Sequence, residues 1–266
     1  MFSERAFFSF VDVTDPDNLP EYHDWQLYDH LPENRALTGV AWGERWVRIA
    51  GADEVETATD HFAGVDSMTM YWFRPPYDES LAQWQQLGAD SVQWGRGPAI
   101  PTVIRRFMGF FDPVKGYVAP HALVSPDVLP YRPNAGVQVT LSRYAEPLGE
   151  QAHLQYRWYD RERLPDLLAV PGVAGAWTYS FREGQNTALL SSDETQLTRH
   201  QARIRLLYLD DDPVETTRRI VEAEQKWAAD GRGGPEGGEE VLFSAPLQAV
   251  VPFRPCPPAA TAAPRG

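Results

Sequence analysis

The chain has 266 residues, of which 43% are hydrophobic and 12% aromatic, and a formal net charge of −13. This negative charge argues against nucleic acid and anionic membranes as partners, because neither offers counter-charge. The single cysteine, Cys256, excludes a disulfide framework and a cysteine-based metal site within one chain. No apolar run approaches the ~20 residues needed to cross a bilayer, and the N-terminus has no leader signature, so we expect a cytoplasmic protein.

The first 111 residues carry the alternating and helical patterns of six elements. Pro16 and Pro20 separate the first strand from the helix that follows it. Leu31-Pro32 ends, kinks or restarts that helix, because an interior proline removes a backbone hydrogen bond. In chain order the patterns predict a strand over 7–13, a helix over 19–30, strands over 40–49 and 67–74, a helix over 81–92 and a strand over 102–111.

A proline-rich segment, 112–136, is the expected linker to a second unit. The patterns beyond it predict a strand over 137–144, a helix over 151–169, strands over 175–182 and 202–209, a helix over 214–229 and a strand over 240–253. We therefore expect a first unit (1–111), the linker, a second unit (137–253) and a disordered tail (254–266).

The two units are copies of one another. The segment 21–43, EYHDWQLYDHLPENRALTGVAWG, aligns without gaps with 154–176, LQYRWYDRERLPDLLAVPGVAGA, at a constant offset of 133. Seven of the 23 paired positions are identical, among them Trp25 with Trp158 and Leu31-Pro32 with Leu164-Pro165. An internal repeat of this size indicates two similar structural units.

Each unit runs β-α-β-β-α-β, the order of the ferredoxin-like fold, in which an antiparallel four-stranded sheet carries two helices on one face. The other face of each sheet would be bare, and Met68, Met70, Trp72 and Phe73 indicate that this face is buried. The nearest partner is the sheet of the other copy. We therefore predict an α+β fold whose two sheets pack face to face as an intramolecular pseudo-dimeric α/β barrel, which could pair again into a homodimer.

The stretch Trp25-x-x-Tyr28-Asp29-His30-Leu31-Pro32, followed by Gly39-Val40, resembles the helix-1 signature of the dimeric α/β-barrel superfamily, in particular its EthD-like and stress-responsive members. The second copy has Arg163 at the histidine position. The resemblance covers residues 6–111 and 137–253 and implies a pocket between each sheet and its helices. It leaves the reaction open, because the superfamily includes cofactor-free monooxygenases, cyclases, isomerases and haem-binding relatives.

At 100° per residue, His23, Gln26 and His30 share the leucine-bearing face of the first helix, whereas Trp25 falls on the solvent side. The two histidines could be hydrogen-bonded core residues. Alternatively, they perform acid–base chemistry, since imidazole titrates near neutral pH. His30, at the motif's histidine position, is the main candidate catalytic residue. His23 is the second candidate, and Gln26 would orient a substrate oxygen.

The corresponding face of the second copy carries Tyr156, Tyr159 and Arg163. Arg163 could form a salt bridge with Asp160, three residues earlier on the helix. Alternatively, Arg163 could bind a carboxylate or enolate while a tyrosine donates a hydrogen bond. We expect the histidine-bearing first half to hold the working site.

Aromatic residues crowd the first half, where they could fill the core or line a cleft. Strand alternation places Tyr71 and Phe73 on one face and Trp72 on the other, so one set should line the cleft beside the helices. Trp42 is a further candidate for substrate binding. An aromatic cavity with few polar groups suits a flat, apolar ligand. The histidine spacing predicts no metal site.

The leading hypothesis is a cofactor-free lyase, isomerase or cyclase in which His30 moves a proton on a small hydrophobic, aromatic or ketonic compound. The alternatives are a cofactor-free monooxygenase and a non-catalytic barrel that binds a ligand, including haem held by a histidine.

Overall fold

The computed structural model describes residues 3–96, 102–185, 197–235 and 237–251. The strands of the first half form an antiparallel sheet in the order β2-β4-β1-β5. The elements of this half are β1 (Ala6–Val13), α1 (Leu19–Trp25), α2 (Leu31–Ala36), β2 (Val40–Val47), the short β3 (Thr57–Ala58), β4 (Ser67–Phe73), α3 (Tyr77–Gln93) and β5 (Val103–Val118).

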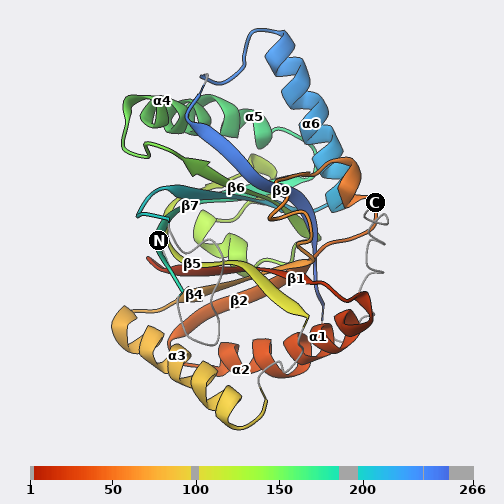
Figure 1. Ribbon diagram of the computed structural model, residues 1–266. Helices are drawn as coiled ribbons and strands as arrows, with labels where there is room; N and C mark the ends of the chain where they lie inside the picture. The colour runs from red at the N-terminus through yellow and green to blue at the C-terminus, as the bar shows by residue number, and fades with distance from the viewer. Residues whose placement is uncertain (1–2, 97–101, 186–196, 236, 252–266) are drawn as a thin grey trace.

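The second half repeats this arrangement with the strand order β7-β8-β6-β9. Its elements are β6 (Gly136–Tyr144), α4 (Glu150–Trp158), α5 (Leu164–Leu167), β7 (Val173–Gly184), β8 (Ala202–Leu209), α6 (Pro213–Ala229) and β9 (Glu239–Ala249). In Figure 1 the two sheets lie one above the other, with α1, α2 and α3 below them and α4, α5 and α6 above. The prediction of two ferredoxin-like units with facing sheets is confirmed.

The two sheets join at both edges into one continuous ring of strands. Along one edge β5 pairs with β7, from Gly109 opposite Gly184 to Val118 opposite Gly175. Along the other edge β9 pairs with β2, where Val47 lies opposite Gln248, and β3 adds a short pairing to β9. In the described part of the chain, ring closure leaves none of the eight long strands with an open edge, and helices α1 to α6 pack on the outer face of the ring.

Strand β5 extends beyond the predicted strand and includes residues 112–118 of the expected linker. Pairing with β7 explains this difference, because β7 supplies hydrogen-bond partners along the added length. Pro113, which has no N–H to donate, lies where the register of this pairing shifts. Two short 3₁₀ turns, Pro120–Ala122 and Pro126–Tyr131, then lead to β6. The tail predicted for residues 254–266 lies outside the described residues.

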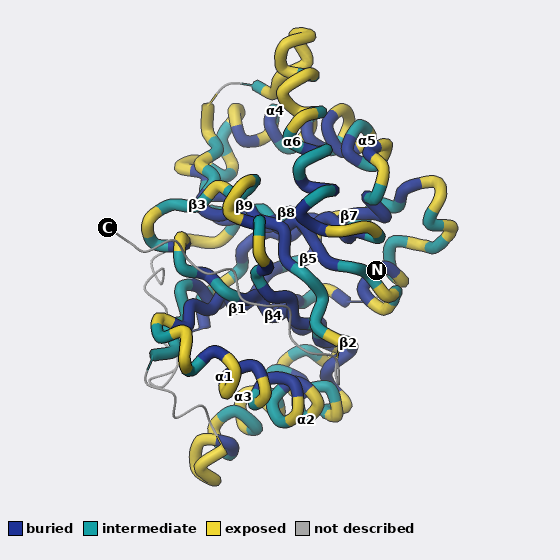
Figure 2. Tube along the Cα trace, turned by 90° about the vertical axis from the view of Figure 1, so that its right-hand side faces the viewer, coloured by how far each residue is buried: buried dark blue, intermediate teal, exposed yellow. Residues whose placement is uncertain are grey.

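The interior of the ring is an aromatic core shared by both halves. Trp72 of β4 meets Trp177 of β7 edge to face at 5.0 Å, and Phe8 of β1 meets Tyr179 at 4.8 Å. Met68 and Met70 lie in the same core, as predicted, but Phe73 packs on the outer, helix-covered face of its sheet. In Figure 2 the strands are largely buried and the outward sides of the helices are exposed.

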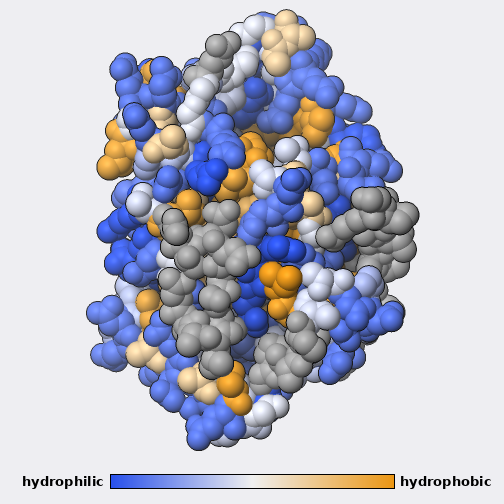
Figure 3. Space-filling model, viewed as in Figure 1, coloured by the Kyte–Doolittle hydropathy of each residue, from blue (hydrophilic) through white to orange (hydrophobic). Residues whose placement is uncertain are grey.

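The face shown in Figure 3 is mostly hydrophilic, and its apolar residues form small separate patches. This pattern agrees with burial of most aromatic side chains in the ring and under the helices. Within the described ranges, the longest helices are too short and too polar to cross a lipid bilayer.

The first helix continues through Leu31-Pro32 by means of a π-helical turn, Gln26–His30, between α1 and α2. In this turn the N–H of Leu31 donates to the carbonyl of Gln26, five residues back. Pro32 has no N–H, and in an α-helix its ring would clash with the carbonyl of Tyr28. The widened turn accommodates the proline without ending the helix.

The second half has the same widened turn, Tyr159–Arg163, between α4 and α5. There the N–H of Leu164 donates to the carbonyl of Tyr159, and Pro165 follows. The repeated Leu-Pro motif thus marks the same local structure in both halves, and this structure sets which side chains face the sheet.

Candidate active site

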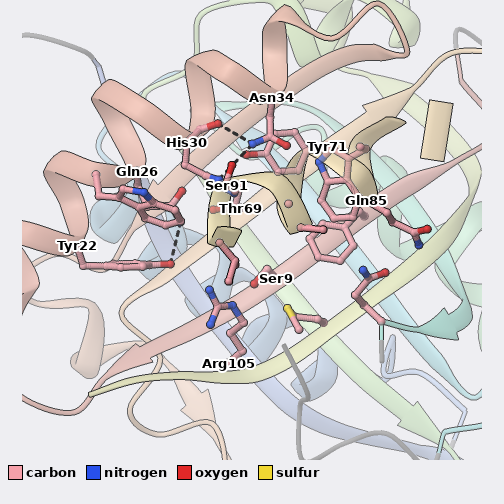
Figure 4. Close-up of a pocket in the computed structure, with 18 residues that line it drawn as sticks. Ser9, Tyr22, Gln26, His30, Asn34, Thr69, Tyr71, Gln85, Ser91 and Arg105 are labelled. Carbon is pink, nitrogen blue, oxygen red and sulfur yellow. Dashed lines mark hydrogen bonds between the residues drawn. The ribbon is translucent and has the colours of Figure 1, made fainter. Parts of the chain in front are cut away.

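The π turn aligns four side chains along one line of the first helix. In an ideal α-helix, three steps of four residues drift by about 120° around the axis. The π turn contains one residue more than an α-helical turn, and one residue corresponds to about 100° of rotation. The extra residue therefore reduces the drift between these side chains to about 20°. As a result Tyr22, Gln26, His30 and Asn34 all line one cavity, and Figure 4 shows them along one side of it.

This cavity has a volume of about 150 Å³ and lies between the first helix, α3 and the outer faces of β1, β4 and β5. Most of its wall is apolar, and the larger apolar side chains are Phe7, Trp25, Tyr71, Trp84, Val92 and Met108. Polar groups enter from the sheet at Ser9, Thr69 and Arg105 (Figure 4). The cavity occupies the predicted position, between the sheet and the helices of the histidine-bearing half.

His30 is held as a neutral imidazole. Its ring stacks on the ring of Trp25, with the two centroids 4.5 Å apart. Trp25 and His30 are five residues apart, and a π turn brings residues at this spacing next to one another. Burial lowers the pKa of His30 to about 4, and the positive charge of Arg105 acts in the same direction. Asn34 Nδ2 lies 3.3 Å from His30 Nδ1 and donates to the His30 carbonyl at 2.6 Å.

Three buried polar atoms of cavity-lining residues have no hydrogen-bond partner in the described parts of the chain. They are Gln26 Oε1, the Tyr71 hydroxyl and Trp84 Nε1. The amide nitrogen of Gln26 is already engaged, since it donates to the Tyr22 hydroxyl at 3.0 Å. Buried polar groups normally have partners. A ligand that carries both hydrogen-bond donors and acceptors would satisfy these atoms.

Arg105 provides the positive charge of the cavity. The neighbouring Arg106 pairs with the buried Asp12 at 2.6 Å, whereas Arg105 forms no ion pair with any described residue. A β-bulge explains how the two arginines separate: Phe10 pairs with Phe107 and Val11 pairs with Arg105, so Arg106 is the extra residue. Burial raises the pKa of Tyr71 above its usual value, so this hydroxyl stays protonated.

The structure brings His30, Gln26 and Tyr71 together but places His23 elsewhere. Seven residues span two turns of an α-helix, and the extra residue of the π turn rotates His23 about 100° away from His30. His23 Nδ1 lies 2.7 Å from Nη2 of the buried Arg45 and accepts its hydrogen bond. Burial lowers the pKa of His23 to about 3, and Arg45 adds to this effect, so His23 is a neutral structural acceptor.

The lowered pKa of His23 predicts a loss of stability in acid. Between pH 6.5 and pH 4.5 the unfolded chain binds a proton at His23 that the folded chain does not, so the free energy of unfolding falls as the pH drops. Replacing His23 with Gln keeps an acceptor for Arg45 and removes this contribution. Urea unfolding at pH 7.5 and pH 4.5 should show wild type losing about 2–3 kcal/mol more than His23→Gln. Equal losses would contradict the assignment.

The other predicted binding residues of the first half do not line the cavity. Trp72 lies inside the ring, and Phe73 packs against Trp84 at 5.6 Å. Trp42 lies under the Arg35 guanidinium at 4.4 Å and beside Tyr131 at 5.2 Å. These contacts make the three residues part of the packing.

The second-half candidates lie on the opposite side of the ring. Tyr159 and Arg163 line a separate cavity beneath α4 and α6. Tyr156 packs on Tyr144 at 5.1 Å and lies under Arg203 at 4.0 Å. Arg163 contacts Glu224 at 4.0 Å, and no salt bridge to Asp160 is found among the described residues.

Four residues of the site are not predicted by the sequence patterns: Tyr22, Trp25, Asn34 and Arg105. The first three follow from the i, i+4 and i, i+5 spacings of a π turn, and the Leu-Pro motif was its only sequence signal. Arg105 required knowledge of the bulge in β5. No group of three or more His, Cys, Asp or Glu side chains in the described segments could hold a metal ion.

No family model matches the chain, and no curated protein is found to be similar to it. Among solved structures, a candidate monooxygenase from Fusobacterium nucleatum subsp. nucleatum has a TM-score of 0.52 at 8% identity, with 94% of each chain covered. An anthrone oxidase-like protein has a TM-score of 0.47 at 12% identity, with 94% of this chain and 92% of that chain covered. A candidate chlorite dismutase has a TM-score of 0.48 at 12% identity, with 93% and 95% covered.

The first of these similarities shows the fold alone, that of two ferredoxin-like units with facing antiparallel sheets. At this level of identity it shows nothing of the reaction. The relation to the dimeric α/β-barrel superfamily, and to its EthD-like branch, stays a prediction.

Proposed function

We propose that the protein is a cofactor-free enzyme in which His30 transfers a proton on a small aromatic or ketonic compound, as in an isomerase, lyase or cyclase. One observation carries this proposal: a neutral imidazole and a guanidinium without an ion-pair partner in the described chain line the same small cavity. No carboxylate lines the described part of the cavity wall, so His30 is the group there that can exchange protons near neutral pH.

In the proposed step, the free ring nitrogen of His30 takes a proton from the carbon next to the substrate carbonyl. The electron pair of the C–H bond forms a C=C bond, and the carbonyl π pair moves to the oxygen. Arg105 and the protonated Tyr71 stabilise the resulting enolate oxygen. The imidazolium then returns the proton to another carbon in an isomerase, or the enolate expels a leaving group in a lyase.

A pKa of about 4 makes His30 a weak base in the absence of substrate. The negative charge that forms on the substrate during the reaction raises this pKa. An enolate about 4 Å from the imidazolium stabilises the cation by roughly 4 kcal/mol at an effective dielectric constant of about 20. That energy raises the histidine pKa by about three units, close to neutrality. The contact between Asn34 Nδ2 and Nδ1, at 3.3 Å, is long and weak, so the ring can carry its proton on either nitrogen.

The size of the cavity limits the substrate. An engineered cavity of about 150 Å³ in another protein binds benzene. The cavity beside His30 has a similar volume, and its aromatic wall suits one flat ring with a short polar substituent. We therefore propose single-ring carbonyl compounds as the substrate class. The test incubates the protein with acetophenone and related ketones in D2O and follows loss of the proton next to the carbonyl by NMR.

Gly88 offers a way to block this cavity without touching His30. Gly88 lines the cavity from α3, and a Cβ added there would meet no atom within 4 Å. We expect Gly88→Leu to fold normally and to abolish ketone exchange, because the new side chain fills the space of the ring. Gly88→Ala is the matched control: it should keep most activity and gain about 0.5–1 kcal/mol of stability from helix propensity. Full exchange activity in Gly88→Leu would show that the reaction occurs elsewhere.

The positive charge of Arg105 should have a measurable effect on the pKa of His30. Removing its charge removes one cause of the lowered pKa and leaves burial, the larger cause, in place. We expect the pKa of His30 in Arg105→Gln to rise above the wild-type value of about 4 while staying below 6.5. NMR titration of the ring protons measures this shift, with the exposed Arg74→Gln as the control. An unchanged pKa of His30 would show that the charge of Arg105 does not act on this histidine.

A cofactor-free monooxygenase is the second candidate, and it fits the description of the Fusobacterium structure. The same carbanion would add to dioxygen to give a hydroperoxide, with the proton supplied by the imidazolium. Oxygen consumption measured beside ketone exchange distinguishes the two reactions. The small volume of the cavity favours a single-ring ligand over haem, whose porphyrin has four pyrrole rings.

A further inference from the structure

The second half repeats the aligned side chains of the first helix with different chemistry. Gln155, Tyr159, Arg163 and Leu167 follow their counterparts by 133 residues, and all four line one cavity. This second cavity has a volume of about 340 Å³ and lies between α4, α6 and the outer faces of β6, β8 and β9. The duplicated scaffold therefore presents a second site, larger than the first.

Charged groups distinguish the second cavity from the first. Four charged side chains line it, Arg163, Arg205, Glu224 and Glu239, so its formal charge is balanced. Arg205 and Glu239 form a salt bridge with each other, and Gln155 Nε2 also donates to Glu239 at 3.0 Å. The charges of Arg205 and Glu239 thus neutralise each other. Arg163 and Glu224 remain as the charged groups that can bind a ligand.

Arg163 is buried between two aromatic rings and is incompletely hydrogen-bonded. The residue is only 5% exposed, and its guanidinium lies between the rings of Trp158 at 4.8 Å and Trp227 at 4.6 Å. Its Nη2 donates to the carbonyl of Arg232 at 3.3 Å, but Nη1 has no hydrogen-bond partner within the described segments. The two aromatic rings hold the plane of the guanidinium. Its remaining N–H donors can therefore bind a planar anion such as a carboxylate.

Glu224 lies one turn of α6 from Ile220, with its side chain 47% exposed. Its Oε1 is 4.0 Å from Arg163 Nε, which is too long for a hydrogen bond. A lone carboxylate bound to Arg163 would be repelled by Glu224, and a lone cation bound to Glu224 would be repelled by Arg163. A molecule that carries a carboxylate and an ammonium group on the same carbon atom can place each charge next to its opposite.

We propose that this second cavity binds a zwitterionic α-amino acid with an apolar side chain. Its carboxylate would accept hydrogen bonds from Arg163, and its ammonium group would pair with Glu224. The apolar part of the wall, formed by Leu167, Leu207, Ile220, Val221 and Val241, would contact the side chain. This site is independent of the proton-transfer cavity on the opposite side of the ring.

The test compares L-leucine with two analogues that each lack one charged group. Titration calorimetry of the full-length protein with L-leucine, 4-methylpentanoate and 3-methylbutylamine should show leucine binding at least tenfold more tightly than either analogue. Tryptophan fluorescence provides a second readout, because Trp158 and Trp227 flank Arg163. Absence of leucine binding, or equal affinity for the pentanoate, would overturn the proposal.

Three variants locate the binding. Arg163→Gln should weaken leucine binding by at least tenfold, and circular dichroism melting checks that it folds. Glu224→Gln, at a half-exposed position, should abolish the preference for leucine over 4-methylpentanoate even if Arg163→Gln fails to fold. Gly88→Leu, which fills the first cavity, should leave leucine binding unchanged. Loss of binding in Gly88→Leu, or a preference retained in Glu224→Gln, would contradict the assignment.

Discussion

Replacing His30 with Gln is expected to lower the rate of ketone proton exchange by 10²- to 10⁴-fold, the usual contribution of a general base. Glutamine keeps a polar side chain of similar size next to Trp25 and Asn34, so the cavity should persist. Its amide cannot accept a proton at neutral pH. The measurement is the initial rate of deuterium incorporation into the identified ketone, at saturating and at low ketone concentrations.

The matched control for this experiment is His153→Gln, an exposed histidine of the second half. It should leave the exchange rate unchanged. A rate in His30→Gln within twofold of wild type would remove His30 from the mechanism. A loss of binding with an unchanged rate at saturation would instead assign His30 to substrate recognition, against our proposal.

Replacing Trp72 with Ala is expected to lower the free energy of unfolding by about 3–5 kcal/mol, the typical cost of removing a large aromatic side chain from a core. Trp72 is completely buried and contacts Trp177 of the other half at 5.0 Å and Tyr179 at 5.8 Å. The cavity left by the change would therefore weaken both halves at once. Urea denaturation followed by circular dichroism should show one cooperative transition at a lower urea concentration.

Trp94→Ala is the control for this change, because Trp94 is 58% exposed at the end of α3. Its effect should stay within about 0.5 kcal/mol. A loss below 1 kcal/mol for Trp72→Ala would contradict its place in the shared interior. Two separate transitions would show that the halves unfold independently, contrary to the closed ring of strands.

The fold could be predicted because it depends on patterns that occur twice. Alternation along β4 predicted that Trp72 and Tyr71 face opposite sides, and the structure has Trp72 inside the ring and Tyr71 at the cavity. Phe73, correctly placed by alternation on the face of Tyr71, was wrongly grouped with the interior residues Met68 and Met70. The length of β5 was missed, because its end is a strand only through pairing with β7.

The candidate site could be predicted only in part, because its geometry depends on two departures from regular structure. A constant 100° per residue placed His23 beside His30 and Trp25 in solvent, and the π turn reverses both. In β5 alternation places Arg105 and Phe107 on one face, but the bulge at Arg106 sends Phe107 inside the ring and Arg105 to the cavity. Neither departure has a strong sequence signal of its own.

The π turn also bears on the origin of the two halves. It occurs at equivalent residues in both halves, before Pro32 and before Pro165. A single insertion in a one-unit ancestor, made before the gene doubled, accounts for both. Because the two copies share one polypeptide, each cavity can carry its own side chain at the equivalent position, the imidazole of His30 in one and the guanidinium of Arg163 in the other.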